Sequence, residues 1–307
     1  MNILLIGHEG YVGKGLHQVL SKQNRVIGWG SKQNILLLNS RTITENKIEA
    51  VVNCATVADR TNECFKVNSE CHEVNVKGMY NLVNSLKDLD VKLVFISTKD
   101  VFGNCINESD VIEKEDHYAL KDLIDDDCPF APITAYAKTK LTGEFVSESH
   151  PQSIVIRLST CYTEADSHRA NLVPHIIKSY LRGGTFKVTN KGKQIRDFLH
   201  VSDLGRLIES FLESNCYGRK INLGGGLENS LSLLQIMRML NPDAQLETFE
   251  GGDYGFAFNN RLAKELFGWT PRKVFSEILP RIVDNITNSI NLLQTGQRAT
   301  GKEQDLA

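Results

Sequence analysis

The first 22 residues contain a short apolar run, a glycine-rich turn and a helical pattern, and this order constrains the fold of the whole chain. Residues 3–6 are Ile-Leu-Leu-Ile, as expected of a strand that is buried on both faces of a parallel sheet. Gly7, Gly10 and Gly13 follow at the spacing G-x-x-G-x-x-G. From Val12 onward apolar residues recur at helical spacing. The sequence therefore predicts a strand, a sharp turn and a helix whose first backbone amides are free.

Free amides at the start of a helix, together with the positive end of the helix dipole, form a site for anions. Glycines at such a turn allow the pyrophosphate of a dinucleotide to approach the backbone closely. The glycine spacing alone is weak evidence, because ordinary strand-to-helix turns also contain glycine. The strand before it and the helix after it favour a cofactor, and we expect Gly7, Gly10 and Gly13 to bind a nicotinamide dinucleotide.

The end of the second predicted strand bears on which dinucleotide is used. Residues 25–29 form this strand, and in folds that prefer NAD an acidic residue at its end binds the ribose 2'-hydroxyl. Here the corresponding residues are Gly30, Ser31 and Lys32. A hydroxyl and an ammonium suit a 2'-phosphate better than a carboxylate does. We expect NADP(H) to be preferred and NAD(H) to be possible, unless Lys32 is only a solvated loop charge.

Three further apolar runs complete the predicted sheet. Residues 35–38 form one, and residues 50–55 form another that ends in the small residues Cys54 and Ala55, which suit a backbone that passes beside a ribose. A helical pattern covers residues 71–86, and residues 92–96 give a fifth strand. Because ligands in open α/β sheets bind at the carboxyl ends of strands, Thr98 is well placed for chemistry.

A long acidic connection follows, over residues 104–128. Asp and Glu outnumber Lys nine to two in this stretch. A connection of this length can act as a lid over a site. A run of carboxylates would repel an anionic substrate, so a solvated excursion is the expectation.

Tyr136 and Lys140 lie four residues apart in a predicted helix that continues to about residue 148, so they share one helix face. A phenol is a poor acid or base at neutral pH, but a neighbouring ammonium favours the phenolate. Tyr-x-x-x-Lys is common by chance and usually forms a surface pair. Its occurrence together with Thr98 and the glycine turn favours a catalytic site.

In this combination the chain resembles the extended short-chain dehydrogenases/reductases, in the NAD-dependent epimerase/dehydratase branch that acts on nucleotide-diphosphate sugars. The resemblance covers residues 1 to about 290. Cys54 and Thr56 are mild departures from it. It rests on GHEGYVG at 7–13, VVNCA at 51–55, VNVKG at 74–78, ISTKDVFG at 96–103, YAKTK at 136–140, NLVP at 171–174 and RDFLHVSDL at 196–204.

The resemblance implies roles for individual residues. Tyr136 is expected as general acid/base on the C4 oxygen of the sugar, Thr98 as a hydrogen-bond partner of that oxygen, and Lys140 as the residue that holds the nicotinamide ribose. Arg196 is expected on the diphosphate, the alternative being a salt bridge with Asp197 or Asp203. The expected cofactor-binding residues are Gly7, Gly10, Tyr11, Val12, Gly13, Gly30, Ser31, Lys32, Cys54, Ala55, Asn75 and Lys140, and the expected substrate-binding residues are Lys99, Asp100, Asn171 and Arg196.

Length and charge fit this reading. The 307 residues can form an α/β Rossmann-type doubly wound parallel sheet with a smaller mixed α/β C-terminal lobe. We expect the dinucleotide domain at 1–158 with a return at about 201–225, the substrate lobe at 159–200 and 226–295, and a polar tail at 296–307. Gly224 to Gly226 is expected to be a tight turn rather than a second phosphate cradle.

The 35 basic and 37 acidic residues give no basic surplus for nucleic acid or an anionic membrane. No Cys or His spacing suggests a metal site, and the seven cysteines fit reduced thiols in a cytoplasmic protein. The resemblance further implies a homodimer.

Four reactions share this machinery. Relatives that dehydrate the sugar carry an Asp-Glu pair after the threonine. This chain has Lys99-Asp100 there, which argues against dehydration. Relatives that epimerise C3 and C5 carry a cysteine at the place of Asp100 and a histidine at the place of Asn171, and neither is present. A 4-ketoreductase is expected marginally ahead of a 4-epimerase with a tightly bound cofactor. A dinucleotide-binding sensor without activity is the least expected outcome, because the predicted site is complete.

Overall fold

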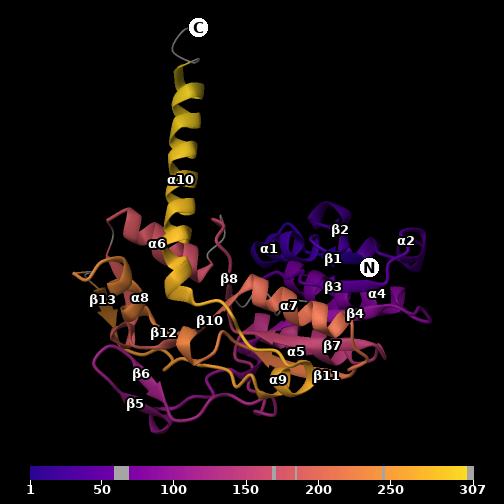
Figure 1. Ribbon diagram of the computed structural model, residues 1–307, viewed down its shortest axis with the longest axis horizontal. Helices are drawn as coiled ribbons and strands as arrows, with labels where there is room; N and C mark the ends of the chain where they lie inside the picture. Colours follow the sequence, from indigo (N-terminus) through magenta and orange to yellow (C-terminus); the bar gives the residue numbers. More distant parts are fainter. Residues whose placement is uncertain (59–68, 168–170, 184, 244–245, 303–307) are drawn as a thin grey trace.

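A computed structural model describes residues 1–58, 69–167, 171–183, 185–243 and 246–302, with side chains described through Leu292. Figure 1 shows two regions: a large parallel sheet with helices on both faces, and a smaller region that carries the long helix α10, Phe275–Lys302. The Rossmann-type fold class is confirmed.

The central sheet has six strands in the order β11-β7-β4-β3-β1-β2, and every neighbouring pair is parallel. The chain leaves β1 toward β2 on one side and returns to β3 on the other, so β1 and β3 flank the point where the strand order reverses. Ligands of open α/β sheets bind at such a point. The strands are β1 Asn2–Ile6, β2 Arg25–Trp29, β3 Ala50–Asn53, β4 Lys92–Thr98, β7 Ser153–Leu158 and β11 Arg219–Leu223.

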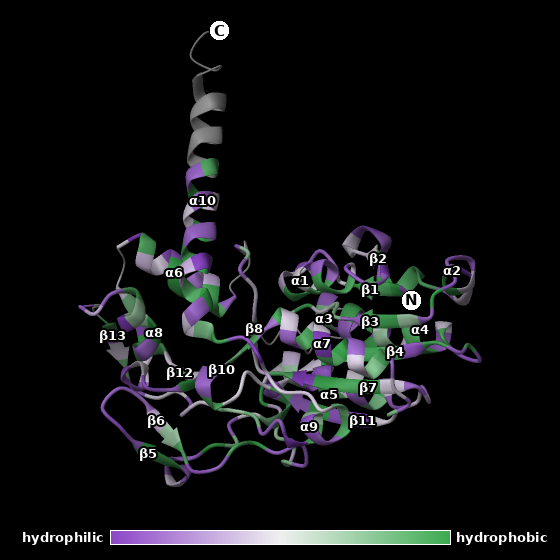
Figure 2. Ribbon diagram, viewed as in Figure 1, coloured by the Kyte–Doolittle hydropathy of each residue, from purple (hydrophilic) through white to green (hydrophobic). Residues whose placement is uncertain are grey.

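The two faces of this sheet are covered by different helices, which explains the unbroken apolar runs. Ile3 and Leu5 pack with α1 and α7 on one face, and Leu4 and Ile6 pack beneath α4 on the other. Figure 2 shows the strands as mostly hydrophobic. The helices are α1 Tyr11–Leu20, α7 Val201–Leu212, α2 Ser40–Glu45, α4 Gly78–Ser85 and α5 Ala135–Ser147.

Two details of this half differ from the sequence pattern. Residues 35–38 do not form a strand: Ile35–Leu37 is a short 3-10 helix whose Asn34 side chain accepts a hydrogen bond from the Leu36 amide. Ile35 and Leu38 are buried whereas Leu37 is exposed, and a short apolar run of this kind fits a single helical turn as well as a strand. The expected helix at 71–86 is present as α3 Glu70–His72, a π-helical turn Glu73–Lys77, and α4.

The smaller region contains a three-stranded sheet, β12-β10-β8, and the pair β13-β9. Its core joins Tyr162, Phe198 and Phe275 to apolar residues of α6, α8 and α10. Helix α10 runs past residue 296, where a polar tail was expected, to Lys302. The elements are β8 Thr160–Tyr162, α6 Leu172–Leu181, β9 Phe186–Thr189, β10 Ile195–His200, β12 Ser230–Ser232, α8 Leu233–Leu240 and β13 Leu246–Phe249. Helix α9, Arg261–Phe267, packs on the sheet half beside β11 and α7.

The acidic connection is only in part the solvated excursion that was expected: most of its charged side chains are exposed, but the segment is docked on the rest of the chain. It forms a hairpin of β5 Val111–Glu113 and β6 Tyr118–Leu120. The Tyr118 amide donates to the Lys193 carbonyl at 3.0 Å, and the Ser232 hydroxyl donates to the Asp116 carbonyl at 2.6 Å. Buried Ile124 forms a bridge with Phe258. The connection is thereby fixed to the smaller region.

The cysteines also differ in part from expectation. Cys71 is disulfide-bonded, so it is not a reduced thiol. The free cysteines among the described residues are Cys54, Cys105, Cys128, Cys161 and Cys216. None of the helices in the described part of the chain combines the length and hydropathy that a membrane span needs.

Candidate functional site

The glycine turn is a tight loop that connects β1 to α1. Gly7 has φ +82°, donates to the Trp29 carbonyl at 2.8 Å, and has no room for a side chain, because a Cβ there would lie 2.6 Å from the Ala55 amide nitrogen. A Cβ on Gly13 would lie 2.1 Å from the Gly7 carbonyl oxygen. Helix α1 follows with Gly10 as N-cap, which offers its first amides no side-chain acceptor. The turn therefore fits a dinucleotide pyrophosphate.

Cys54 and Ala55 lie at the same edge, at the end of β3. The Cys54 amide and thiol both donate to the Ile6 carbonyl at 3.0 Å, which joins the ends of β1 and β3. Burial raises the pKa of the Cys54 thiol to about 12, so it stays protonated at neutral pH. The two residues thus present backbone beside the glycine turn, where a cofactor contact was predicted.

Lys140 lies under the end of β4 and is 3% exposed. Its ammonium donates to the Ile96 carbonyl at 2.5 Å and lies 4.2 Å from the centre of the Phe95 ring. Burial lowers its pKa to about 8, and the negative charge of Glu144 opposes this shift. A buried ammonium at this edge is a strong local source of positive potential.

Tyr136 and Thr98 belong to two elements that pack against each other, helix α5 and strand β4. Tyr136 is in the first turn of α5, whose N-cap Thr134 accepts a hydrogen bond from the Ala137 amide. Thr98 ends β4, and its hydroxyl oxygen accepts from the Asp100 amide at 3.2 Å. Helix α5 packs closely on β4 because residue 143 is glycine: a Cβ there would lie 2.6 Å from the Phe95 ring. The first turn of α5, which contains Tyr136, thus belongs to a helix that packs on β4, the strand that ends at Thr98.

Sequence reasoning missed a buried ion pair behind Lys140. Arg157 and Glu144 have side chains that are 1% and 0% exposed, and two guanidinium nitrogens bind the carboxylate at 2.9–3.1 Å. The Ser97 hydroxyl donates to the same carboxylate at 2.5 Å, and Arg157 also donates to the Asp126 carbonyl at 3.0 Å. This network ties β4, α5 and β7 to the acidic connection. Its sequence signal was an arginine inside the apolar strand SIVIRL.

A carboxylate does lie at the end of β2. It belongs to Glu9, which is part of the glycine turn. Both the amide and the hydroxyl of Ser31 donate to Glu9 Oε2 at 3.0 Å. These hydrogen bonds hold the pKa of Glu9 below its usual range. The NADP(H) prediction assumed that no carboxylate lies here, and that assumption was wrong. Glu9 was missed because it precedes Ser31 by 22 residues.

Arg196 on β10 is paired with a residue that the sequence did not suggest. Its two terminal nitrogens bind the Asp253 carboxylate at 2.7 and 3.0 Å. The two predicted alternatives, Asp197 and Asp203, have other partners. Asp203 forms an ion pair with Arg206, and the Asp197 carboxylate accepts a hydrogen bond from the Phe258 amide. The side chains of Arg196 and Asp253 are 17% and 30% exposed, so the pair is accessible at the surface of the smaller region.

Asp197 fills the turn at Gly224 to Gly226. Its carboxylate accepts hydrogen bonds from the amides of Gly225 and Phe258 at 2.6 and 3.0 Å, and a Cβ on Gly224 would lie 1.9 Å from it. Burial raises its pKa to about 7 despite these bonds. A carboxylate already occupies this turn, which agrees with the expectation that it is not a second phosphate cradle.

Four more predicted residues already have partners in the protein. Asn75 donates to the Val57 carbonyl and the Thr139 hydroxyl, and it accepts from the Val57 amide, so it braces the loop after β3. The Tyr11 hydroxyl bonds to the amide and carbonyl of Thr163. Lys99 and Asp100 form an ion pair at 3.1 Å, with the Lys99 ammonium over the Phe256 ring.

Asn171 is the N-cap of α6, and its amide donates to the Ser167 hydroxyl at 2.7 Å. It lies in the smaller region, at the start of α6. The binding roles of Asn171, Asn75, Tyr11, Lys99 and Asp100 stay predictions.

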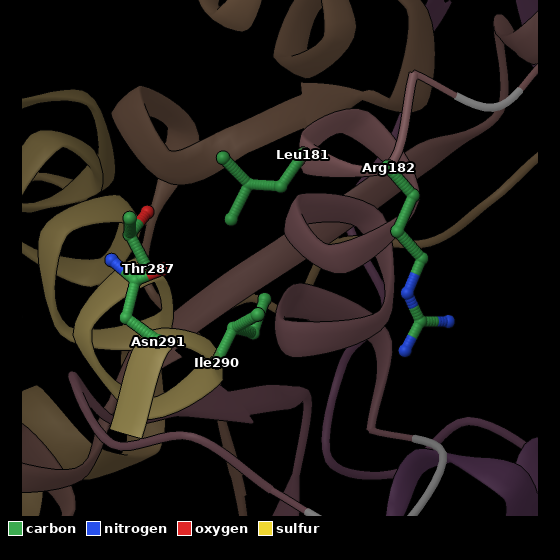
Figure 3. A pocket seen from close by; sticks show the side chains of 5 residues that line it. All are labelled: Leu181, Arg182, Thr287, Ile290 and Asn291. Atoms are coloured by element: carbon green, nitrogen blue, oxygen red, sulfur yellow. The ribbon is translucent and has the colours of Figure 1, made fainter. Parts of the chain in front are cut away.

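Two surface hollows in the described part of the chain lie apart from the predicted site residues. One, of about 480 Å³, lies between the end of α6 and α10 and is lined by Leu181, Arg182, Thr287, Ile290 and Asn291, as Figure 3 shows. The other, of about 380 Å³, lies between α1 and α7 beside Arg206 and Arg272. Neither is lined by a predicted site residue, so the site rests on the strand ends and not on these hollows.

The chain is similar to curated proteins whose names describe enzymes of dTDP-glucose and UDP-glucose. It is 23% identical over 208 residues to "dTDP-glucose 4,6-dehydratase" of Mycolicibacterium smegmatis, covering 64% of this chain and 60% of that protein. It is 21% identical to "Uncharacterized UDP-glucose epimerase YtcB" of Bacillus subtilis, covering 96% and 98%.

Among solved structures, it resembles UDP-glucuronic acid 4-epimerase from Bacillus cereus in complex with NAD. The TM-score is 0.78 at 22% identity, and the match covers 94% of this chain and 99% of that chain. At this identity the likeness supports the fold alone. Residues 3–224 match the sequence profile described as "NAD dependent epimerase/dehydratase family", and the chain belongs to that family.

Proposed function

We propose that the protein is a nucleotide-diphosphate-sugar 4-epimerase that uses a bound nicotinamide dinucleotide. The observation that supports this proposal is the packing of α5, which carries Tyr136 and Lys140, on β4, which ends at Thr98 near the strand crossover. A pyrophosphate on the turn puts the cofactor across this edge of the sheet.

Each of the three residues has a defined chemical task. A bound cofactor would supply the acceptor for a hydride from the sugar C4 and the donor that returns it to the opposite face of the 4-keto carbon. Tyr136 takes the proton of the C4 hydroxyl and later gives it back. The buried ammonium of Lys140 makes this proton transfer easier by stabilising the phenolate electrostatically. The Thr98 hydroxyl holds the C4 oxygen in place.

Dehydration is disfavoured by the groups that follow Thr98. Loss of a hydroxyl from the sugar needs both an acid for the leaving group and a base for the neighbouring carbon. This chain offers the Asp100 carboxylate, which is paired with the Lys99 ammonium at 3.1 Å. One paired carboxylate is a poor substitute for an acid and a base in separate positions.

A 4-ketoreductase is the second candidate. The segment between β2 and β3 is short, with two 3-10 turns and one six-residue helix, and the resemblance stated above implies that a short segment here favours a reductase. The expected NADPH site at Gly30 to Lys32 had favoured the reductase. The Glu9 carboxylate at Ser31 removes that argument, which leaves the epimerase ahead.

Arg196 and Asn171 are proposed to bind the diphosphate of the substrate. A guanidinium fork suits two phosphate oxygens, and Arg196 now uses that fork for Asp253. The diphosphate would therefore share Arg196 with Asp253 or replace it.

A homodimer is proposed through α4 and α5, which cover the same face of the sheet. Tyr80 and Phe145 on these helices are 54% and 55% exposed. Large exposed apolar side chains on adjacent helices are typical of an interface between copies. Light scattering at micromolar concentration should give twice the mass of 34.4 kDa, whereas Tyr80→Lys should give the single mass.

The reaction is tested with purified protein and a panel of NDP-hexoses and 4-keto-6-deoxy NDP-sugars. Sugar conversion followed by chromatography, without net change in the absorbance of the reduced nicotinamide, supports the epimerase. Stoichiometric loss of that absorbance with a 4-keto sugar supports the reductase instead. Formation of a 4-keto-6-deoxy product would identify a dehydratase.

A further inference from the structure

Gly30 leaves a space at the end of β2 that Glu9 fills. A Cβ on Gly30 would lie 2.5 Å from the carboxyl carbon of Glu9 and 2.5 Å from its Oε2. The Glu9 carboxylate thus lies against the backbone of the residue that follows β2. It is fixed there by the amide and the hydroxyl of Ser31, both at 3.0 Å.

The donors at this strand end are already committed. The Gly30 amide donates to Gln33 Oε1 at 2.8 Å, and the Ser31 amide and hydroxyl donate to Glu9. A phosphate group needs such donors, and it would have to take them from a carboxylate of the same charge. The one basic side chain that the NADP(H) prediction named here is Lys32. It is exposed, on the short 3-10 helix Ser31–Gln33.

We propose that Glu9 selects NAD(H) against NADP(H). Its carboxylate takes the place of the acidic residue that such folds usually carry at the end of the second strand. It accepts a hydrogen bond from the ribose 2'-hydroxyl and repels a 2'-phosphate. This inference rests on the proposed function, in that it assumes a nicotinamide dinucleotide on the glycine turn.

Affinity measurements on the protein without sugar test the proposal. The probes are NADH and NADPH, titrated with their own fluorescence as readout, on the wild type, Glu9→Gln and the control Glu49→Gln. Glu49 is matched because its carboxylate also accepts a backbone amide, from Asn2 at 2.7 Å, but at the opposite edge of the sheet. Glutamine at position 9 keeps an acceptor for Ser31 and loses the charge.

The wild type should bind NADH at least about tenfold more tightly than NADPH. In Glu9→Gln this ratio should fall to about threefold or less, mainly through tighter NADPH binding, and in Glu49→Gln it should stay as in the wild type. Because the charges are exposed to solvent, the wild-type ratio should also shrink when salt is raised. A ratio that Glu9→Gln leaves unchanged, or a wild type that prefers NADPH, overturns the proposal.

A competition experiment needs no variant. AMP should displace NADH from the wild type more effectively than adenosine 2',5'-bisphosphate, which adds only the 2'-phosphate. Equal or stronger displacement by the bisphosphate overturns the role of Glu9, while the binding of a dinucleotide and a reaction at the sugar C4 stand. If neither dinucleotide binds the wild type, both the proposed function and this inference fail.

Discussion

Two arginine–carboxylate pairs, one in each half of the molecule, have similar geometry and very different surroundings. Arg157 and Glu144 lie under the sheet half with side chains 1% and 0% exposed. Arg196 and Asp253 lie in the smaller region at 17% and 30%. In the first pair Glu144 also accepts from the Ser97 hydroxyl, and the Arg157 guanidinium lies 5.1 and 4.8 Å from the centres of the Phe102 and Phe130 rings. The second lies beside Gly251, Gly252 and Gly255, which have φ between +84° and +111°.

The comparison separates fixed parts from exchangeable ones. A fully buried pair cannot lose a partner without leaving a charge in an apolar interior. A pair at the surface costs little to open, because water and salt screen it. The sheet half therefore holds its reactive groups in place, and the smaller region can exchange an internal carboxylate for a ligand of the same charge.

The largest effect should come from the phenol of the sheet half. Tyr136→Phe removes the proposed acid/base, and kcat should fall by about 10³-fold or more, while Kd for the NDP-sugar changes little. Tyr118→Phe, the same change in the acidic connection, serves as control. Steady-state kinetics with calorimetric Kd values check this, and a variant that keeps more than about a tenth of the rate would remove Tyr136 from the mechanism.

The ion pairs themselves can be compared by stability. Glu144→Gln leaves Arg157 buried without its counter-charge and should lower the free energy of unfolding by about 3–5 kcal/mol. Asp253→Asn should lower it by less than about 1 kcal/mol. Urea denaturation of the apo-protein gives both values. Equal losses would mean that the contrast between the two pairs does not hold.

The contribution of Lys140 to the free energy of unfolding should depend on pH. Its pKa is about 8 in the folded chain and 10.5 in the unfolded one. Between these values the unfolded chain binds more protons, so the contribution of Lys140 to the free energy of unfolding rises with pH, by about 3 kcal/mol in total. We expect this rise in the difference between wild type and Lys140→Met, measured by urea denaturation at pH 7.5 to 10.5. A flat difference would contradict the burial of the ammonium.

The smallest effect should come from the exchangeable pair. Arg196→Lys loses the fork and should raise Kd for UDP about tenfold, with a free energy of unfolding close to that of the wild type. Asp253→Asn should lower Kd for UDP, because it removes the competing carboxylate. Calorimetric titration checks both variants. Weaker UDP binding in Asp253→Asn would show that Asp253 supports Arg196 instead of competing with the ligand.

The sequence predicted what local patterns encode, and missed contacts between distant segments. The strand, turn and helix at residues 2–20 follow from steric demands within that segment, and they were predicted correctly. The contact between Glu9 and Ser31 depends on the pairing of β1 with β2, and that between Arg196 and Asp253 depends on a chain return after 57 residues. Side-chain partners of this kind cannot be read from spacing along one segment.

The acidic connection shows the same limit from the other direction. Its charge suggested exposure to water, but Ile124 and the backbone around Tyr118 attach it to the smaller region. Composition reports the average of a segment, whereas docking depends on a few apolar side chains and on hydrogen bonds of the main chain.

Gly143 has no functional group, yet it determines how closely the helix that carries Tyr136 and Lys140 packs on the sheet. Because this residue lacks a Cβ, α5 rests directly on the Phe95 ring of β4. Tyr136 and Lys140 are on the same rigid helix, so even a methyl group at position 143 would move both of them outward together. The distance between acid/base and sugar is thus fixed by the thickness of a helix–sheet contact one to two turns away from either residue.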